Sequence, residues 1–502
     1  MVARVMTVAP IGFNGSLIEV ESDTTNGLPS FQIVGLGNKA IDEAKERVRS
    51  AITNSLLEFP KKRITINLAP AELPKDGAHY DLPIALAILC VSGQLRQQEL
   101  DQAVYAGELA LDGSLRPVRG AISIAETAKH HQYKRIYLPL ANAEQASLIQ
   151  GIDIIPVASL KDIFLHLKKE RLLEPYQSIK QTTALNTPLE PPLIDDVHGQ
   201  EQAKRALIIA AAGHHNILFT GSPGAGKTML AKTLVNLLPD LSQEEQVATT
   251  KLHSLAGEAN EEIVTKRAFR TPHHTASRVA IVGGGTHPKP GEISLAHLGV
   301  LFLDELPEYP RATLEALRQP LEDKLISVSR ADGRATYPAD FMLVATMNPC
   351  PCGYYGDPSK ECTCSSTQIL AYQKRLSGPL LDRIDLVVHV SRVPNEMLLN
   401  NKPLNNSQHL AARNSIDTAL KAQQNRHSRC IKYNSSMNNR DISKYAPISS
   451  DAQKMLSQAT ERLALSARSY LKVIKVARTI ADLSGEDNIT LAHISEALQY
   501  RS

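Results

Sequence analysis

The chain contains no tryptophan, and aromatic residues make up only 4% of its 502 positions. Many proteins that bind single-stranded nucleic acid stack bases on aromatic side chains, so this composition argues against a base-stacking platform. The net charge of +3 is also small, so any surface that binds a polyanion must be a local cluster of basic residues. With 43% hydrophobic and 21% charged residues, the rest of the composition is typical of a soluble globular protein.

Long apolar runs are scarce as well. The most apolar stretch, LPIALAILCV (82–91), has about half of the roughly 20 residues that a membrane-spanning helix needs. The first residues, MVARVMTVAPIGF, lack the long apolar core of a signal peptide. Of the six cysteines, four lie within 350–364, while Cys90 and Cys430 stand alone. This distribution suits a reducing compartment better than a disulfide scaffold, and we expect a cytoplasmic protein.

The length of the chain predicts two or three domains. The stretch SIKQTTALNTPLEPPLID is polar, contains proline and has no apolar periodicity, which is typical of a linker. We place this linker at 173–193. It separates an N-terminal domain (1–172) from a nucleotide-binding core (194–393), and a helical domain (394–502) follows the core.

A phosphate-binding loop is the clearest motif. An apolar strand ends at Thr220, the string GSPGAGKT follows, and a helical pattern begins. In such a loop, backbone N–H groups surround the phosphates of a nucleotide. Lys227 would pair with the β- and γ-phosphates, and Thr228 would hold Mg²⁺. We therefore expect ATP and Mg²⁺ to bind at Gly221, Ser222, Pro223, Gly224, Ala225, Gly226, Lys227 and Thr228.

Two further apolar strands end in polar residues that suit the same chemistry. The string GVLFLDELPEYP brings Asp304 and Glu305 to the end of one strand. Asp304 would ligate Mg²⁺ through water, and Glu305 would polarise the attacking water. The strand in FMLVATMNP ends in Asn348, whose amide can orient water against the γ-phosphate. Together with the phosphate loop, these residues predict hydrolysis of a nucleoside triphosphate.

Four cysteines crowd the string CPCGYYGDPSKECTC with the spacing C-x-C-x9-C-x-C. Four thiolates at such short range can close a tetrahedral Zn²⁺ site. A segment with little apolar material of its own would also benefit from a metal staple. We expect a structural zinc bound by Cys350, Cys352, Cys362 and Cys364, with free reduced thiols as the alternative.

The N-terminal domain resembles the proteolytic domain of Lon proteases. In those enzymes Pro-Lys-Asp-Gly is followed by Pro-Ser-Ala-Gly, which carries the nucleophilic serine. Here PKDGAHYD places His79 at the position of that serine. The hairpin GELALDGSLRPV is followed by RGAISIAE, and Ile122 stands where the activating lysine belongs. Because a hydroxyl nucleophile needs a neighbouring base, we expect a Lon-like fold without peptidase activity.

Over nearly its whole length, the chain resembles the ComM/YifB family of magnesium-chelatase-like AAA+ ATPases. The strings that carry the resemblance are FQIVGLGNKAIDEAKERVRSAI, FRTPHHTASRVAIVGGG and MNPCPCGYYGD. It implies an α/β fold, an AAA+ P-loop core with a C-terminal helical lid. An α+β Lon-protease-like (ribosomal S5 domain 2-like) domain would precede this core. It also implies a hexameric ring that drives DNA branch migration when incoming single-stranded DNA is recombined during natural transformation.

The resemblance assigns roles to two arginines. Arg383, in SGPLLDRIDLVVHV, matches the arginine-finger segment of the clade that contains magnesium chelatase and the MCM helicases. Such an arginine acts on the nucleotide of a neighbouring subunit and stabilises charge during phosphoryl transfer. Arg468 matches the sensor 2 position, from which it would reach the γ-phosphate. Arg478 lies on the same segment and is the alternative.

Two segments of the core are candidates for DNA contact. The first, 265–292, carries five basic residues (Lys266, Arg267, Arg270, Arg278 and Lys289) against the single acid Glu292, and such a cluster favours phosphates. The second, KLISVSRADGRATYP (324–338), predicts a hairpin with Asp332-Gly333 in its turn. In related helicases, hairpins just before sensor 1 reach into the pore of the ring. We expect sequence-independent backbone contacts from Lys324, Arg330, Arg334, Arg278 and Lys289.

Three other functions remain open from the sequence. An ATP-dependent protease would fit the Lon-like domain but is opposed by His79 and Ile122. A chelatase-type motor that remodels a protein partner would fit the AAA+ clade, although chelatase motor subunits generally lack a Lon-like domain. A nucleotide-gated scaffold is opposed by the complete set of residues for hydrolysis.

Overall fold

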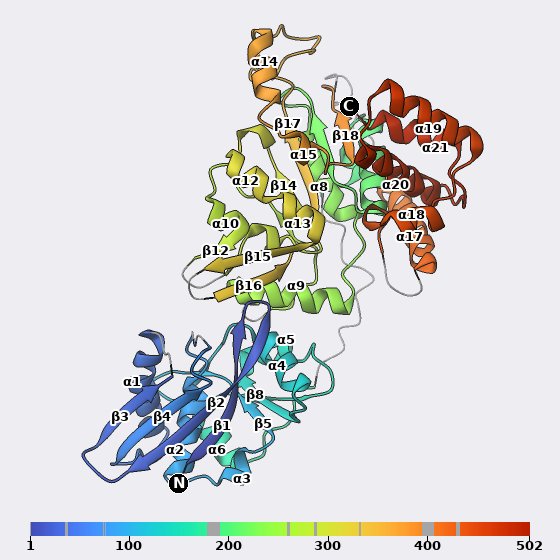
Figure 1. Cartoon of the computed structure of the whole chain (residues 1–502). Helices are drawn as coiled ribbons and strands as arrows, with labels where there is room; N and C mark the ends of the chain where they lie inside the picture. The colour runs from blue at the N-terminus through green and yellow to red at the C-terminus, as the bar shows by residue number, and fades with distance from the viewer. Residues whose placement is uncertain are drawn as a thin grey trace.

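The computed structural model describes residues 2–501, with the exception of 36–38, 74, 76, 178–190, 259–261, 286–288, 331–332, 394–405 and 428–431. Side chains at 39–42 and 329–334 are also outside the description. Most of the predicted linker, Cys430 and the side chains of Arg330 and Arg334 therefore lie outside the described residues. Figure 1 shows an N-terminal mixed-sheet domain, a core with a parallel sheet and a C-terminal helical region.

The N-terminal domain is built on a seven-stranded sheet with the order β3-β4-β2-β1-β5-β8-β9. The long strands β1 and β2 pair antiparallel along their whole length, whereas β1, β5, β8 and β9 run parallel. Burial alternates along β4, as expected for a strand with one face on the core. The strands are β1 (Ala3–Ile11), β2 (Asn14–Thr25), β3 (Ser30–Val34), β4 (Arg63–Ala69), β5 (Ala103–Tyr105), β8 (Arg135–Pro139) and β9 (Asp153–Val157).

Helix α2 fills the centre of this domain. Every residue from Asp81 to Cys90 is buried, as expected of a helix that is apolar all round. It packs on β1, β2 and α1. The predicted hairpin around Asp112-Gly113 is confirmed by the pairing of β6 with β7. The remaining elements are α1 (Lys39–Asn54), α2 (Asp81–Val91), α3 (Gln97–Leu100), β6 (Glu108–Leu109), β7 (Leu115–Arg116), α4 (Ala121–His130), η1 (Leu140–Asn142), α5 (Ala143–Ala146) and α6 (Leu160–Leu167).

The core is a five-stranded sheet with the order β11-β14-β17-β10-β18, and all its neighbours are parallel. The carboxyl ends of parallel strands meet at one edge, where ligands of open α/β sheets bind. The strands are β10 (Ile217–Thr220), β11 (Phe269–Arg270), β14 (Val300–Leu303), β17 (Met342–Met347) and β18 (Leu386–His389). The helices are η2 (Ile194–Asp196), α7 (Glu201–Gly213), α8 (Lys227–Leu237), α9 (Gln243–Ala256), η3 (Leu306–Glu308), α12 (Arg311–Ala316), α13 (Arg318–Asp323), α14 (Ser366–Gln373) and α15 (Gly378–Leu381).

Two small additions decorate the core. The segment 265–292 forms the short ladder of β12 (Gly283–Gly284) with β13 (Lys289–Pro290), together with α10 (Arg278–Val282) and α11 (Glu292–Leu295). The predicted hairpin before β17 is present as β15 (Leu325–Arg330) and β16 (Gly333–Pro338). Gly333 pairs with Arg330 across the turn and begins β16, whereas Asp332 lies outside the described residues.

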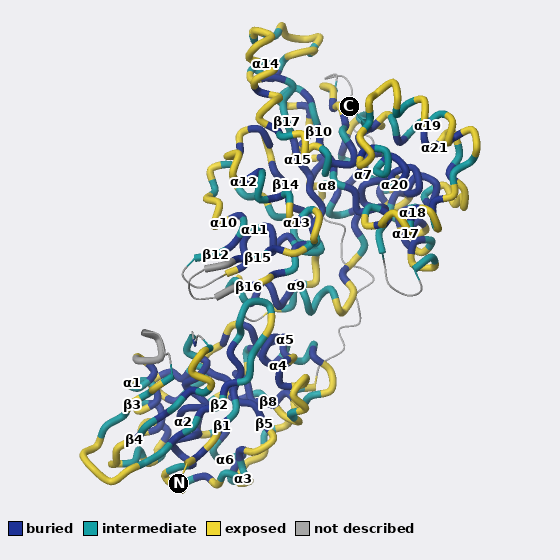
Figure 2. Tube along the Cα trace, viewed as in Figure 1, coloured by how far each residue is buried: buried dark blue, intermediate teal, exposed yellow. Residues whose placement is uncertain are grey.

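The helical region packs on the core through α7, which contacts both α17 and α20. A single apolar cluster runs from Ile194 in the core to Tyr500 near the C-terminus. Figure 2 shows this continuity as buried residues in α7 and α20, whereas α14 is largely exposed. The elements are α17 (Ser407–Arg426), η4 (Asn434–Ser436), α18 (Asn439–Tyr445), α19 (Ser450–Arg462), α20 (Ala467–Leu483) and α21 (Leu491–Gln499). No described helix combines the length and apolarity needed to cross a bilayer.

The N-terminal domain contacts the core through the turn between β1 and β2, which reaches β16 and α9 (Figure 1). A Cβ at Gly12 would lie 3.2 Å from the Cβ of Ala335. The Phe13 ring packs against an apolar cluster of the core, and the Lys251 ammonium lies 4.1 Å from the centre of that ring. Lys251 also pairs with Glu126 of α4. Polar and apolar contacts therefore hold the two domains together.

We expect Phe13→Ala to loosen this contact. The ring is only partly buried, so the loss should be about 1–3 kcal/mol, less than for a fully buried phenylalanine. Leu28→Ala is the matched control, because Leu28 is 90% exposed at another turn of the same sheet. Thermal unfolding should show a lower midpoint for Phe13→Ala alone. Equal midpoints for both variants would show that the turn does not stabilise the contact.

Candidate nucleotide-binding site and four-cysteine loop

The phosphate loop lies at the carboxyl edge of the core sheet, between β10 and α8. Gly224 and Gly226 have φ values of 79° and 88°, a left-handed conformation that glycine adopts without strain. A Cβ at Gly221 would lie 2.1 Å from the carbonyl oxygen of Val390, so only glycine fits there. Thr228 is exposed in the first turn of α8. The loop therefore presents the N-terminus of an eleven-residue helix, a site that suits phosphate.

Lys227 connects this loop to the end of β17. Its buried ammonium donates to the carbonyls of Gly221 (2.5 Å) and Ser222 (3.1 Å) and to Oδ1 of Asn348 (3.0 Å). Burial lowers the pKa of Lys227, while the charges of Asp304 and Glu305 act in the opposite direction. The ammonium is therefore held at the mouth of the loop, next to the acidic residues.

The two acids follow β14 and are held by the neighbouring strand. The hydroxyl of Thr346 donates to Oδ1 of Asp304 at 2.5 Å and accepts from the backbone N–H of Glu305 at 2.9 Å. Glu305 has φ 52°, an unusual conformation for a non-glycine residue that functional sites often contain. The amide of Asn348 donates to Oε1 of Glu305 at 3.4 Å.

The structure thus brings together the predicted residues Lys227, Asp304, Glu305 and Asn348. Thr346, which orients both acids, was missed by the sequence analysis. Its position near the end of β17, two residues before Asn348, was the available signal, because residues i and i+2 of an extended chain face the same side.

Arg383 lies at the opposite edge of the same sheet. Its backbone carbonyl accepts a hydrogen bond from the side chain of Asn216 (2.9 Å), and Asn216 immediately precedes β10. The phosphate loop follows the other end of β10, about 13 Å away at about 3.3 Å per strand residue. Arg383 is therefore placed away from the phosphate loop of its own chain.

Arg468 lies beside Arg383, since both side chains bind the carboxylate of Glu322. The alternative sensor 2 residue, Arg478, is only 2% exposed. It donates to the Asp482 carboxylate at 2.8 and 3.0 Å and to backbone carbonyls within the helical region. Arg478 is thus bound inside the helical region, while Arg468 is 42% exposed.

The basic cluster at 265–292 is smaller than its sequence indicates. Arg267 binds Glu245 and two backbone carbonyls, and Arg270 binds Glu258 and Glu292. Hydrogen bonding to Glu292 is the main reason why the pKa of Arg270 is raised. Both arginines are therefore paired within the chain, through Glu245 and Glu258 outside the segment and through Glu292 inside it.

Of the five residues predicted to contact DNA, three have described side chains. Arg278 and Lys289 are exposed. Lys324 instead forms an ion pair with Asp340 at 2.5 Å, so its charge is already balanced within the chain. The side chains of Arg330 and Arg334 lie outside the described residues.

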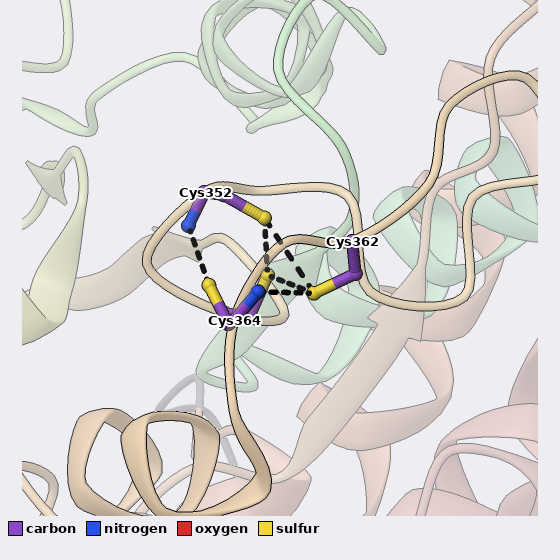
Figure 3. A group of neighbouring side chains, drawn as sticks. Cys352, Cys362 and Cys364 are labelled. Carbon is purple, nitrogen blue, oxygen red and sulfur yellow. Dashed lines mark hydrogen bonds between the residues drawn. The ribbon is translucent and has the colours of Figure 1, made fainter.

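The four cysteines of 350–364 converge on one point, as Figure 3 shows for three labelled side chains. The sulfur of Cys350 lies 3.3 Å from that of Cys352 and 3.6 Å from that of Cys362, and the latter two are 3.5 Å apart. All four sulfurs, including that of Cys364, lie within 4.8 Å of one another. Tetrahedral zinc with bonds of about 2.3 Å places its sulfurs roughly 3.8 Å apart, so the cluster fits this metal.

The surroundings of the sulfurs also suit a metal thiolate site. Backbone N–H groups of Cys352, Tyr355 and Cys364 point at sulfur atoms over 3.4–3.5 Å. A hydrogen bond from the Tyr354 backbone lowers the pKa of Cys352, whereas the neighbouring thiols raise the pKa values of Cys362 and Cys364, so the four thiols do not ionise alike without a metal. Bound zinc would link the two ends of the loop. It would have no catalytic role there, because four protein ligands leave no open position for water.

The four-cysteine loop packs on the phosphate loop, a contact that the sequence did not reveal. A Cβ at Gly353 would lie 2.7 Å from the ring of Pro223. Asp357 forms a side-chain hydrogen bond with Ser222, and Arg392 donates to the carbonyl of Pro223 at 3.2 Å. The four-cysteine loop therefore packs against the outer surface of the phosphate loop.

The Lon-like dyad positions hold no nucleophile–base pair. His79 is 6% exposed, and its ring lies on that of Tyr80 at 4.0 Å. Ile122 is fully buried in an apolar cluster. The nearby carboxylate of Asp81 binds Arg47 at 2.7 Å. Both positions therefore lie in a packed interior.

Comparison with known families places magnesium-chelatase motifs along most of the chain. The family described as magnesium chelatase, subunit ChlI, matches residues 193–398, and its C-terminal part matches 405–501. The family described as subunit ChlI of Mg-chelatase matches residues 20–142. The matches cover parts of the N-terminal domain, the core and the helical region.

Individual relatives extend over the full length. Competence protein ComM of Haemophilus influenzae is 43% identical over 502 residues, which cover 100% of this chain and 97% of the relative. YifB of Escherichia coli is 44% identical, covering 99% of this chain and 96% of the relative. Lon protease 2 of Bacillus subtilis is 26% identical over 172 residues, covering 33% of this chain and 31% of the protease.

We expect about one zinc per chain in protein purified without added metal, because the four sulfurs already have tetrahedral spacing. Elemental analysis measures this directly. Cys350→Ser should lower the thermal midpoint more than the ATPase rate of the folded fraction, whereas Cys90→Ser, at a separate cysteine, should leave the zinc content unchanged. Metal-free protein with four titratable native thiols in the loop would contradict the zinc assignment.

Proposed function

The chain belongs to the ComM/YifB family of magnesium-chelatase-like AAA+ ATPases, and we propose that it couples ATP hydrolysis to branch migration of DNA. The observation that carries this proposal is the full-length identity of 43% to a competence protein. We propose natural transformation as the setting, with incoming single-stranded DNA as the substrate. The N-terminal domain would be a Lon-like fold that has lost its peptidase function.

The hydrolysis step follows from the site geometry. Glu305, fixed by Thr346 and Asn348, would polarise a water that attacks the γ-phosphorus, and the bond to the β-phosphate oxygen would break to give ADP and phosphate. Lys227 would balance charge on the β- and γ-phosphates. Mg²⁺ held by Thr228 and Asp304 would neutralise the negative charge that develops on the phosphates.

Arg383 and Arg468 support the ring assembly. Both lie at the sheet edge opposite the phosphate loop of their own chain, so they would complete the site of the neighbouring subunit. A hexamer is the assembly that we propose. Each nucleotide would then lie between two subunits, and hydrolysis would depend on assembly.

The proposed DNA surface consists of the β15–β16 hairpin and the exposed residues Arg278 and Lys289. The hairpin joins the core immediately before β17, which ends next to Asn348. Movement at the nucleotide site can therefore reach the hairpin through one strand. Contacts to the phosphate backbone would be independent of sequence.

A motor that remodels a protein partner is the second candidate, favoured by the matches to the magnesium chelatase subunit. A three-strand exchange substrate without sequence heterology separates the two functions. Branch migration by the purified protein with ATP supports the main proposal. ATP hydrolysis that moves no branch at any protein concentration would refute it.

Arg383→Ala should bind ATP but hydrolyse it poorly. Arginines that act in trans contribute about 10³–10⁵ to the rate in related systems, so a loss below about tenfold would argue against this role. Mixing Arg383→Ala with Glu305→Ala should restore some turnover, because a mixed ring contains sites with an intact base and an intact arginine. Arg462→Ala, an exposed arginine on α19, is the control. A full rate in dilute monomers would exclude action in trans.

The double variant Arg330→Ala/Arg334→Ala should lose branch migration and DNA stimulation of the ATPase. Its residual DNA binding should have a shallower salt dependence, by roughly 0.7–0.9 in log–log slope per lost phosphate contact. The control is Lys61→Ala/Lys62→Ala, which removes two exposed charges from the N-terminal domain. Normal branch migration by the hairpin variant would indicate that the 265–292 segment, and not the hairpin, contacts DNA.

A further inference from the structure

Glu322 has an unusual position between the two arginines proposed to act in trans. Its Oε2 accepts from Nη2 of Arg383, and its Oε1 accepts from Nη2 of Arg468. One carboxylate on α13 thus joins a residue that precedes β18 to a residue of α20. The Glu322 side chain is 49% exposed, so the bridge lies at the surface where a neighbouring subunit can approach.

The two arginines depend on this bridge to different degrees. Arg383 is 11% exposed and also donates to the carbonyls of Arg318 (3.0 Å) and Pro379 (2.6 Å). Among the described residues, the side chain of Arg468 makes no other hydrogen bond or ion pair. Removing the carboxylate would therefore release Arg468 more than Arg383.

The backbones that carry the arginines are fixed by a separate ion pair. Lys472, one helical turn beyond Arg468, donates to Oδ1 of Asp385 at 2.6 Å. Asp385 lies two residues after Arg383, and its other oxygen faces Nδ1 of His215 at 3.5 Å. This pair sets how far apart α20 and the Arg383 segment lie. Glu322 instead sets the direction in which the two guanidinium groups point.

Two guanidinium groups brought together without a counter-charge repel each other. A shared carboxylate removes that repulsion and holds both groups in one orientation, which lowers the entropy that is lost when they engage a phosphate. We propose that Glu322 is a positioning residue that aligns Arg383 and Arg468 as one pair for the nucleotide of the neighbouring subunit. This inference rests on the proposed hydrolysis in trans.

The test is the steady-state ATPase of the assembled full-length protein, without DNA. Glu322→Gln keeps the size of the side chain and removes its charge, so kcat should fall by about tenfold, a part of the effect of a trans arginine. The KM for ATP should change little, because the phosphate loop lies at the opposite edge of the sheet. Asp323→Asn is the matched control, since it removes an exposed charge from the next residue of the same helix and should keep the wild-type kcat.

A double-mutant cycle separates positioning from a structural role. If Glu322 acts through Arg468, Glu322→Gln should lower kcat little further in an Arg468→Ala background, whereas independent effects would add. Because exposed ion pairs contribute little to stability, the thermal midpoint and the mass of the oligomer should stay close to wild type. Glu322→Asp, which is too short to reach both arginines, is a second variant and should also lower kcat.

Wild-type or faster hydrolysis by both Glu322→Gln and Glu322→Asp would overturn the inference, as would full additivity with Arg468→Ala. Failure of the wild type in strand exchange would refute only the proposed DNA function, because this assay contains no DNA. Full hydrolysis by monomers would refute both the action in trans and the positioning role.

Discussion

The parallel pairing of β10 between β17 and β18 is the constraint on which the remaining structure depends. It is fixed at the amino edge by Asn216, whose side chain accepts from the N–H of Leu343 at 2.8 Å and donates to the carbonyl of Arg383. The carboxyl edge of the same strands carries Lys227 and Asn348. A single sheet therefore holds Lys227 and Asn348 at one edge and Arg383 at the other.

The sequence was enough to predict that Lys227, Glu305 and Asn348 meet at one edge of the sheet, because each of them follows a short local pattern. An apolar strand followed by GSPGAGKT, or by Asp304-Glu305, needs no distant partner to be recognised. The sequence did not show that Arg267, Arg270 and Lys324 are paired, since their partners Glu245, Glu258 and Asp340 lie elsewhere in the chain. Counting charges along a segment says nothing about such pairing. For the same reason, the sequence did not reveal the bridge of Glu322 or the contact between the four-cysteine loop and Pro223.

The four-cysteine loop and the N-terminal domain each contact a segment of the core with a proposed function, namely the phosphate loop and the β15–β16 hairpin. The four-cysteine loop packs on the phosphate loop through Gly353 and Asp357. The N-terminal domain places Gly12 against Ala335 of the β15–β16 hairpin. The polar and apolar groups at both contacts come from segments far apart in the sequence, so the fold alone creates them.

The base of the β15–β16 hairpin is fastened to the core at Lys324, and its strands also pack on the core through the buried side chains of Ile326, Val328 and Tyr337. Lys324, with φ 58°, ends α13 and pairs with Asp340, and the N–H of Ala339 donates to its carbonyl at 2.8 Å. Beyond this fastening, the paired strands extend six residues each, or about 20 Å at about 3.3 Å per residue. Because Ile326, Val328 and Tyr337 share one apolar cluster with Leu301 and Leu343 of the sheet, the hairpin and the sheet form one packed unit.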